Sequence, residues 1–358
     1  MGYSFRSMAG SEHERSGQRT GAARRAPGAP EPPGLAPAFA WLARHELPIL
    51  LALVAFAALV RALRWQVTAV MFNDGPDFLR LALAFGRLDF ATALAHPFHP
   101  LYPLATALVD TLVGRPETAA VVVSVAAGSL AVAALHAMVR SALSPAHGLI
   151  AAGLLATQPQ AIEYTGDIQS EGLYLFFFLT TAALALSALR RGSAPRSVAA
   201  GAMAGLAYLT RPEGLGLLGV AGAVAGLQAL RGQRSWRKVV GLGLALAAGF
   251  LLVASPYLGW LRIHEGHWML SQKKSVSTLV GIDAPGHGSP AGSAPPPKPG
   301  SPPPAPEPLR FAEALAEVAD AHMRALHYGP LLLLALALCL GTAGRGREPY
   351  GSFVAIAL

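Results

Sequence analysis

Long segments without a single charged residue limit the folds that this chain can adopt. Residues 118–139 and 239–258 are two such runs. A helix needs about 20 mostly apolar residues to cross the roughly 30 Å hydrocarbon core of a bilayer. Only 13% of the residues are charged, about half of the roughly 25% that is usual in a soluble domain. The sequence therefore excludes a soluble enzyme and predicts an all-α, polytopic transmembrane helical bundle.

Other long runs that are mostly apolar recur along the chain, some of them with one charged residue. The candidate spans are 47–63, 118–139, 147–163, 170–189, 197–210, 213–230, 239–258 and 329–343. The two spans that flank Thr210-Arg211-Pro212-Glu213 are short, which leaves open a tight hairpin or a broken helix that lines a cavity.

The segment 97–113 decides the topology. It is apolar, but it contains three prolines, His99 and Asp110. If it does not cross, 16 of the 28 Lys and Arg residues but only 5 of the 20 acidic residues lie on the cytoplasmic side, as the positive-inside rule requires. If it crosses, the central basic clusters move outside. We therefore expect a juxtamembrane or dipping helix here, a cytoplasmic N-terminus and a multi-pass membrane protein.

The net charge of +8 does not indicate a nucleic-acid partner, because the basic residues form short clusters between apolar segments rather than one continuous face. Cys339 is the single cysteine, so an intramolecular disulfide is excluded.

Composition divides the chain into a core and flanking segments. The prediction is a disordered basic cytoplasmic tail (1–40), a transmembrane core (41–284) with a first outer loop (64–117), a Pro-rich low-complexity outer loop (285–310), an amphipathic helix (311–328) and further transmembrane segments (329–358). The chain ends within an apolar stretch, so we expect it to be truncated.

Two carboxylates begin an amphipathic helix in the first outer loop. Pro76 suits the first helical turn, and the apolar residues that follow repeat with helical period. Asp74 and Asp77 therefore either cap this helix and complement its dipole or take part in chemistry. His96 and His99 follow in AHPFHPLYPL, and we expect the prolines to bring both histidines close to the helix, in structural or substrate-contact roles and without a metal site.

Three acids cluster at the outer boundary of two later spans. They are Glu163, Asp167 and Glu171. Ionisable groups at membrane depth are costly, so they are usually functional or paired. The alternative is that Asp167 or Ser170 caps the helix that follows.

Cations stand near the same boundary. Arg211 either binds an anion such as phosphate or pairs with Glu213 or another acid. Lys273 and Lys274 follow the last central span and meet either a phosphate or lipid headgroups. Acids and cations around a membrane-level cleft suit group transfer from a lipid-linked, phosphate-activated donor. They equally suit a proton-coupled transporter.

The motifs NDGPDFLRLALAF, HPFHPLYPL, YTGDIQSEGLYLFFFL and GLAYLTRPEGL occur in this order. This series resembles bacterial membrane glycosyltransferases of the C superfamily, in particular family 39, the dolichyl-phosphate-mannose-protein mannosyltransferase-like proteins. It is also similar to the aminoarabinose–lipid A transferase. The resemblance covers residues 45–275.

The resemblance implies a C-superfamily bundle with an extracytoplasmic juxtamembrane helix loop, located in the bacterial inner membrane. It also implies a polyprenyl-phosphate sugar donor and an active site on the outer face. Asp74 matches a family acid that acts as base or positions the acceptor. Gly75 stands where the family often has a second acid, for which Asp77 is the candidate substitute. Asp167 matches a further family acid.

The sequence thus predicts a membrane glycosyltransferase that moves a hexosyl or pentosyl group from a polyprenyl-phosphate donor to an extracytoplasmic hydroxyl. The candidate catalytic residues are Asp74, Asp77 and Asp167. The candidate substrate-binding residues are His96, His99, Glu171, Arg211, Glu213, Lys273 and Lys274. We predict no nucleic-acid partner and no specific cofactor, with a divalent cation left open.

Two other functions remain as alternatives to the glycosyltransferase. The first is a transporter or flippase for a lipid-linked substrate, which an internal repeat would support, although the sequence shows none. The second is a non-catalytic membrane protein of envelope assembly, for which Gly75 and the abrupt end of the chain are the arguments.

Overall fold

The computed structural model describes residues 36–272, and the regular elements in this range are all helices. In chain order they are α1 (Ala36–Arg44), α2 (Glu46–Gln66), α3 (Gly75–Gly86), α4 (Phe90–Leu94), α5 (Leu101–Val113), α6 (Pro116–Ala142), α7 (Pro145–Thr157), α8 (Pro159–Thr165), α9 (Glu171–Arg191), α10 (Ala194–Thr210), the 3₁₀ turn η1 (Pro212–Leu215), α11 (Gly216–Leu230) and α12 (Trp236–Glu265).

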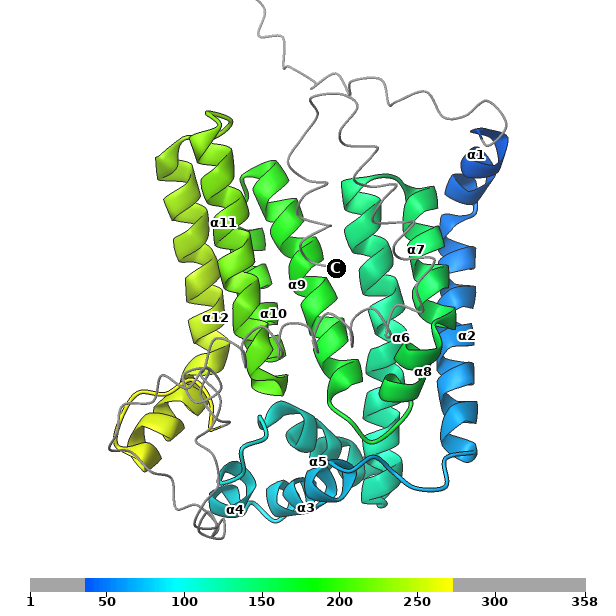
Figure 1. Ribbon diagram of the computed structural model, residues 1–358, viewed down its shortest axis with the longest axis vertical. Coiled ribbons are helices and arrows are strands. Elements are labelled where there is room, and N and C mark those ends of the chain that lie inside the picture. The colour runs from blue at the N-terminus through cyan, green and yellow to red at the C-terminus, as the bar shows by residue number, and fades with distance from the viewer. Residues whose placement is uncertain (1–35, 273–358) are drawn as a thin grey trace, which may run out of the picture.

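Five of these helical stretches are long and apolar enough to cross a membrane: α2, α6, α9, α12 and the continuous stretch formed by η1 and α11. They stand side by side with α10 in one bundle (Figure 1). The all-α, multi-pass architecture predicted from the apolar runs is confirmed.

The helices alternate in direction along the bundle, so the short turns gather at its two ends. The turns α6–α7, α9–α10 and α11–α12 lie at the upper end in Figure 1. These turns carry basic residues, among them Arg140, Arg190, Arg191, Arg231 and Arg237. The basic clusters of the described part of the chain therefore share one end, as the positive-inside argument requires.

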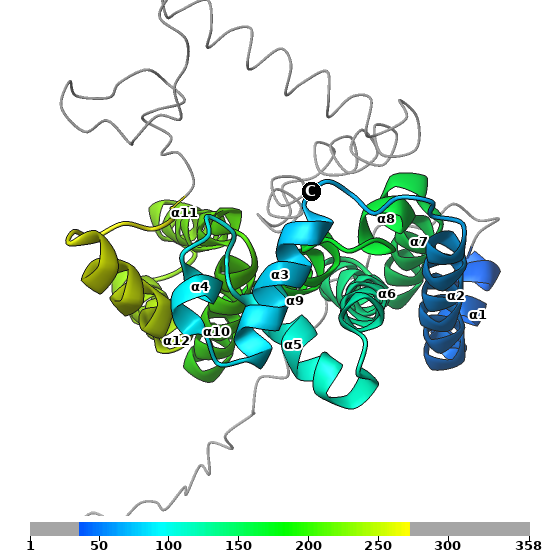
Figure 2. The same ribbon diagram turned by 90° about the horizontal axis from the view of Figure 1, so that it is seen from below.

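Three helices of the first outer loop cover the opposite end. Figures 1 and 2 show α3, α4 and α5 lying across the lower ends of the long helices. With 13 residues, α5 is about 20 Å long at 1.5 Å per residue, which is too short for the roughly 30 Å core. This placement agrees with the expectation that 97–113 does not cross.

Two sequence predictions need correction. The span 147–163 is not one helix, because it is broken into α7 and α8 at Gln158, whose backbone is extended with φ −70° and ψ 120°. Pro159 follows, and a proline drives the residue before it out of the helical region. Residues 36–40, assigned to the disordered tail, belong to helix α1.

Some of the predictions lie outside the described residues. They concern the tail up to residue 35, Lys273, Lys274, the Pro-rich loop 285–310, the amphipathic helix 311–328 and the segment 329–358.

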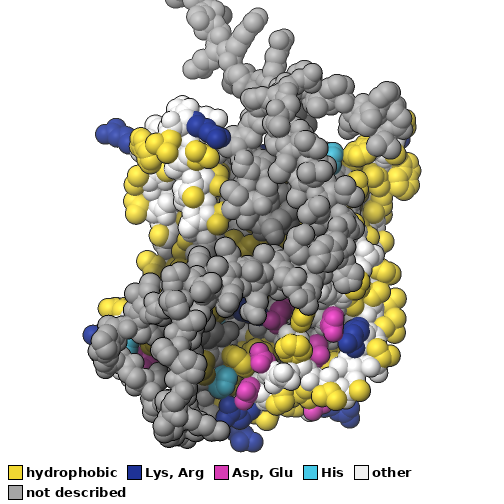
Figure 3. All heavy atoms as spheres, in the orientation of Figure 1, with side chains coloured by type: hydrophobic (Ala, Val, Ile, Leu, Met, Phe, Trp, Pro, Cys, Tyr) yellow, Lys and Arg dark blue, Asp and Glu magenta, His cyan; other side chains and the backbone are white. Residues whose placement is uncertain are grey.

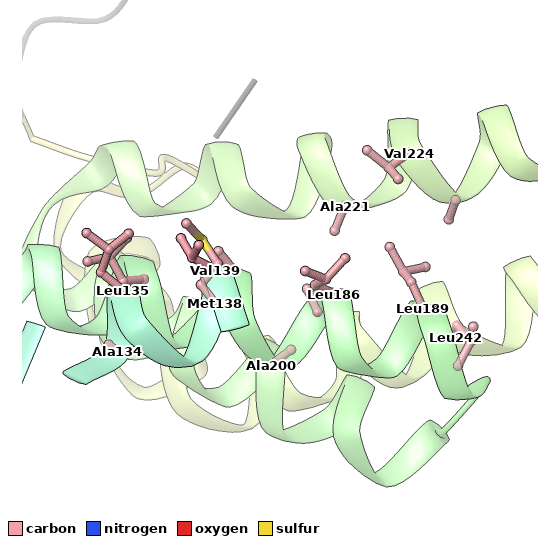
Figure 4. Close-up of a cluster of buried hydrophobic side chains, with 14 of the residues drawn as sticks. Ala134, Leu135, Met138, Val139, Leu186, Leu189, Ala200, Ala221, Val224 and Leu242 are labelled. Carbon is pink, nitrogen blue, oxygen red and sulfur yellow. The ribbon is translucent and has the colours of Figure 1, made fainter. Parts of the chain in front are cut away.

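The bundle is held together by apolar side chains from neighbouring helices. Leu135 and Met138 of α6, Leu186 of α9 and Val224 of α11 meet in one buried cluster (Figure 4). Small residues bring α10 and α12 closer still. A Cβ atom on Gly201 would overlap the carbonyl oxygen of Leu246. Close backbone approach of this kind is a common way to pack helices in a membrane, where apolar burial alone gives little driving force.

Candidate functional site

The acidic residues of the described chain gather at the end covered by the outer loop. In Figure 3 the visible acidic side chains lie in the lower half of the molecule. The acids that the sequence analysis singled out at this end are Asp74, Asp77, Glu163, Asp167, Glu171 and Glu213. Arg80 and Arg211 lie among these acids, whereas Glu46 is at the other end of the bundle beside Arg140.

Asp74 stands at the N-terminus of α3 but does not cap it. It occupies the N-cap position without a side-chain hydrogen bond to the helix, and the residue is exposed. The helix is instead fixed by its apolar face, on which Phe78, Leu81 and Phe85 are buried. The capping role is therefore excluded for the Asp74 carboxylate, which is left available to solvent or a substrate.

Asp77, in the first turn of α3, contacts Arg80 and His96. Its Oδ1 lies 3.0 Å from Nη2 of Arg80, and its Oδ2 lies 3.8 Å from Nε2 of His96. Burial lowers the pKa of His96, and the carboxylates of Asp77 and Asp74 oppose that change. Asp77 and His96 thus lie together beside Asp74, as the sequence predicted.

Asp167 links the loop after α8 to the first outer loop. Only 9% of the residue is exposed. Its Oδ1 accepts hydrogen bonds from the backbone N–H of Ile168 at 2.6 Å and of Phe72 at 3.5 Å. Ser170, at the N-cap of α9, makes no side-chain cap bond. Asp167 therefore does not cap α9; it connects its own loop to a residue only two positions before Asp74.

A buried hydroxyl pair supports the Asp167 loop from beneath. The hydroxyl of Tyr102, a fully buried residue of α5, lies 2.8 Å from Oγ of Ser124 in α6. Ser124 in turn donates to the carbonyl oxygen of Gln169 at 3.2 Å. Burial raises the pKa of Tyr102, so its hydroxyl stays protonated. Neither Tyr102 nor Ser124 is among the residues predicted from the sequence to form the site.

Arg211 lies in an extended stretch between α10 and η1, with φ −152° and ψ 139°. Its Nη1 forms an ion pair with Glu171 at the start of α9, and its Nε lies 3.6 Å from Oε2 of Glu213. The guanidinium carbon is 5.9 Å from the centre of the Tyr174 ring, within range of a cation–π contact. From the sequence we expected Arg211 either to bind an anion or to pair with Glu213 or another acid. It pairs with Glu213 and with a second acid, Glu171.

His99 follows Phe98, whose ring lies 4.7 Å from that of Phe78 in α3. The His99 ring packs at 5.0 Å from Tyr208 of α10 and 5.3 Å from Tyr257 of α12. Its Nε2 lies 3.3 Å from Oγ of Ser271. His99 thus joins the segment that follows α4 to α10 and α12, contacts that the sequence did not predict.

Metal ligands are not clustered in the part of the chain that the structure describes. Within residues 36–272, no group of three or more His, Cys, Asp or Glu side chains is close enough to hold a metal ion.

A family comparison matches the centre of this bundle. Residues 95–260 match the family described as dolichyl-phosphate-mannose-protein mannosyltransferase. The matched segment includes Asp167, Glu171 and Arg211, and it begins after Asp74 and Asp77. The resemblance seen in the motifs is thereby confirmed. No curated protein matches the sequence.

The fold is also similar to that of a solved membrane glycosyltransferase. That structure is the archaeal oligosaccharyltransferase AglB from Archaeoglobus fulgidus in complex with an inhibitory peptide and a dolichol-phosphate. The TM-score is 0.53 at 16% sequence identity, and the match covers 60% of this chain and 30% of the AglB chain. This chain therefore spans less than a third of AglB, and the likeness concerns the fold. The all-α bundle is a multi-pass membrane fold similar to the part of AglB that it matches.

Proposed function

We propose that this protein is a membrane glycosyltransferase that moves a sugar from a polyprenyl-phosphate donor to an extracytoplasmic hydroxyl. The family match over residues 95–260 and the AglB-like fold support the class. The separation of basic turns from the acidic end supports an outer active site with a cytoplasmic N-terminus, which fits a bacterial inner membrane.

One observation carries the assignment of the site. The exposed carboxylate of Asp74 forms neither a cap bond nor an ion pair with any residue of the range 36–272. Its loop is nevertheless held against the Asp167 loop through the backbone of Phe72. An unengaged carboxylate on a fixed loop has the properties that a general base or an acceptor-positioning group needs.

The proposed reaction is a single displacement at the anomeric carbon of the donor. The acceptor oxygen forms the new bond to this carbon while the bond from the carbon to the phosphate oxygen breaks. The acceptor proton passes to Asp74, and the polyprenyl phosphate leaves with the electron pair. Attack from the face opposite the leaving group inverts the configuration. Asp77 holds His96 in place beside this base. Asp167 holds the loop that follows α8.

The leaving phosphate needs positive charge. Arg211 uses Nη1 and Nε for Glu171 and Glu213, and Nη2 takes part in neither contact. We assign Nη2 to a donor phosphate oxygen, together with Lys273 or Lys274. Charge-assisted hydrogen bonds of this type stabilise the charge that develops on the departing group. Glu171 and Glu213 keep Arg211 in position.

The test compares two carboxylates of the same loop. Full-length protein in liposomes is given a polyprenyl-phosphate sugar and an acceptor, and the transferred sugar is measured. Asp74→Asn should lower the rate by on the order of a hundredfold or more, since general-base catalysis is worth about 10²–10⁴-fold. The control is Asp89→Asn, because Asp89 caps α4 through the N–H of Thr92 at 3.1 Å and should leave the rate unchanged.

Transfer at the parent rate by Asp74→Asn would exclude the base assignment. Movement of the lipid-linked sugar across the liposome membrane, without any transfer by the parent protein, would instead favour a transporter or flippase. Absence of both activities in the intact protein would favour a non-catalytic role in envelope assembly.

A further inference from the structure

Arg61 is a completely buried cation in a helix of which little else is buried. It lies near the outer end of α2 and is 0% exposed. Only 11% of the apolar window of α2 is buried inside the protein. An arginine at membrane depth is costly and is rarely kept without a function. The burial of Arg61 on this exposed helix therefore needs an explanation.

The contacts of Arg61 are directed at one short helix. Its Nε donates to Oγ1 of Thr165 in α8 at 2.6 Å, and its Nη1 donates to the carbonyl oxygen of Ala57 at 3.0 Å. Within residues 36–272, Nη2 has no hydrogen-bond partner and no carboxylate forms an ion pair with the guanidinium. Arg61 is therefore not half of a buried salt bridge, and a well-packed apolar side chain would be less costly at this position.

The surrounding backbone is shaped to hold this contact. A Cβ atom on Gly128 of α6 would lie 2.6 Å from Oγ1 of Thr165 and 3.0 Å from Nε of Arg61. A Cβ atom on Gly166 would lie 3.2 Å from the carbonyl oxygen of Arg61. Two glycines thus leave room for α2, α6 and α8 to meet around a single hydrogen bond.

The hydrogen bond between Arg61 and Thr165 lies near the start of the two loops that carry Asp74 and Asp167. Thr165 is the last residue of α8 and precedes Asp167 by two positions, while α2 ends at Gln66 and leads to Asp74. Further along, the N–H of Phe72 meets Oδ1 of Asp167. The two loops are therefore fixed to each other at their origin and again beside the acids.

We propose that Arg61 is a positioning residue which, through Thr165, sets the separation of Asp74 and Asp167. The proposal rests on the glycosyl transfer proposed above. Arg61 itself does not touch a substrate, because it has no exposed surface. Its effect is on the geometry of the two loops, and a displacement of about 1 Å in an active site is enough to lower a rate by on the order of a hundredfold.

The first test measures this geometry without any reaction. In a Cys339→Ser background, spin labels on Asn73→Cys and Tyr164→Cys report the distance between the two loops, since both residues are exposed. Thr165→Val keeps the shape of the side chain but removes the hydroxyl, and it should broaden the distance distribution. Arg61→Gln should do the same, whereas Thr165→Ser, which keeps the hydroxyl, should not.

Arg64→Gln is the matched control. Arg64 also joins α2 to α8, through Glu163 at 3.8 Å, but this pair is exposed to solvent. The control should leave the distribution as it is in the parent. If Arg61→Gln fails to fold, the distance distribution of Thr165→Val still tests the proposal. An unchanged distribution in Thr165→Val, or an equal broadening in Arg64→Gln, would overturn the proposal.

The second test separates positioning from stability. Thr165→Val should lower kcat by roughly tenfold to a hundredfold with little change in the donor KM, and Thr165→Ser should restore kcat. A lower Tm with kcat unchanged per folded molecule would show a purely structural role. If the parent protein transfers no sugar, the proposed function fails, while the distance measurement still tests the link between Arg61 and the two loops.

Discussion

Glu171 at the start of α9 and Arg211 after the end of α10 form an ion pair, although they lie 40 positions apart in the sequence. Arg211 also contacts Glu213 at 3.6 Å. The Arg211 guanidinium therefore pairs with two carboxylates, and the three side chains together carry a net negative charge. An anionic donor can be accepted here only through the remaining donor group of Arg211 and additional cations.

This arrangement makes a prediction for Arg211. Arg211→Ala removes the proposed phosphate contact and leaves two carboxylates facing the donor, so the donor KM should rise by on the order of tenfold or more, equivalent to about 1.4 kcal/mol. Steady-state kinetics in liposomes measure this change. Arg87→Ala is the control, because Arg87 is an exposed arginine of the segment 64–117 and has no role in the proposed phosphate contact. An unchanged donor KM in Arg211→Ala would make Arg211 a structural ion-pair partner only.

The histidine beside Asp77 predicts a pH effect on stability. Burial holds the pKa of His96 below its ordinary range, against the opposing carboxylate of Asp77. The unfolded chain therefore binds more protons than the folded protein as the pH falls through about 6.5, the ordinary histidine pKa. Acidification in this window destabilises the fold.

Thermal unfolding in detergent tests this pH effect. Tm should fall between about pH 7.5 and 5.5, and the fall should be smaller in His96→Asn, which cannot be protonated. The two proteins should differ least at the upper end of the range, where His96 is neutral in both states. Equal slopes in parent and variant would contradict the prediction.

Local patterns were enough for the fold and for part of the site. Apolar runs predicted the long helices, and the amphipathic pattern behind Pro76 predicted α3. Both features depend on residues close in sequence, so a single chain is enough to recognise them. The prediction that 97–113 does not cross came instead from the distribution of basic residues over the whole chain.

The contacts that shape the site depend on distant residues. Glu171 meets Arg211 only because α9 and α10 pack side by side, and no spacing rule connects them. The same holds for His99, whose neighbours Tyr208 and Tyr257 come from α10 and α12. Arg61 did leave a signal, since it is a charge inside an apolar run. Its partner Thr165, 104 positions away, left none.

The tight crossing of α10 and α12 predicts a glycine that cannot be replaced. A Cβ atom on Gly249 would overlap the backbone carbonyl of Val198, and backbone cannot move aside as a flexible side chain does. Gly249→Ala should therefore destabilise the bundle by about 1–3 kcal/mol, the usual cost of overpacking. Gly259→Ala in the same helix is the control, because nothing lies within 4 Å of its Cβ position. Equal Tm values for the two variants would argue against this crossing.

A labelling experiment tests whether the two acid loops share one face of the membrane. Single cysteines replace Asn73, Tyr164 and Ala194 in a Cys339→Ser background, and intact cells receive a membrane-impermeant maleimide. Tyr164 in α8 reports on the loop that carries Asp167, and the residue is 41% exposed. Gln169 is nearer to Asp167, but it is only 3% exposed and would label poorly. Ala194 stands at the α9–α10 turn among the basic residues.

Labels at 73 and 164 but not at 194 are expected, because α3 and α8 lie towards the acidic end and the α9–α10 turn lies at the basic end (Figure 1). Position 194 should label once the cells are permeabilised, which controls for its reactivity. Labelling at 73 and 194 without 164 would mean that segment 97–113 crosses the membrane. Asp74 and Asp167 would then lie on opposite sides, and a shared active site would be excluded whatever the activity of the variants.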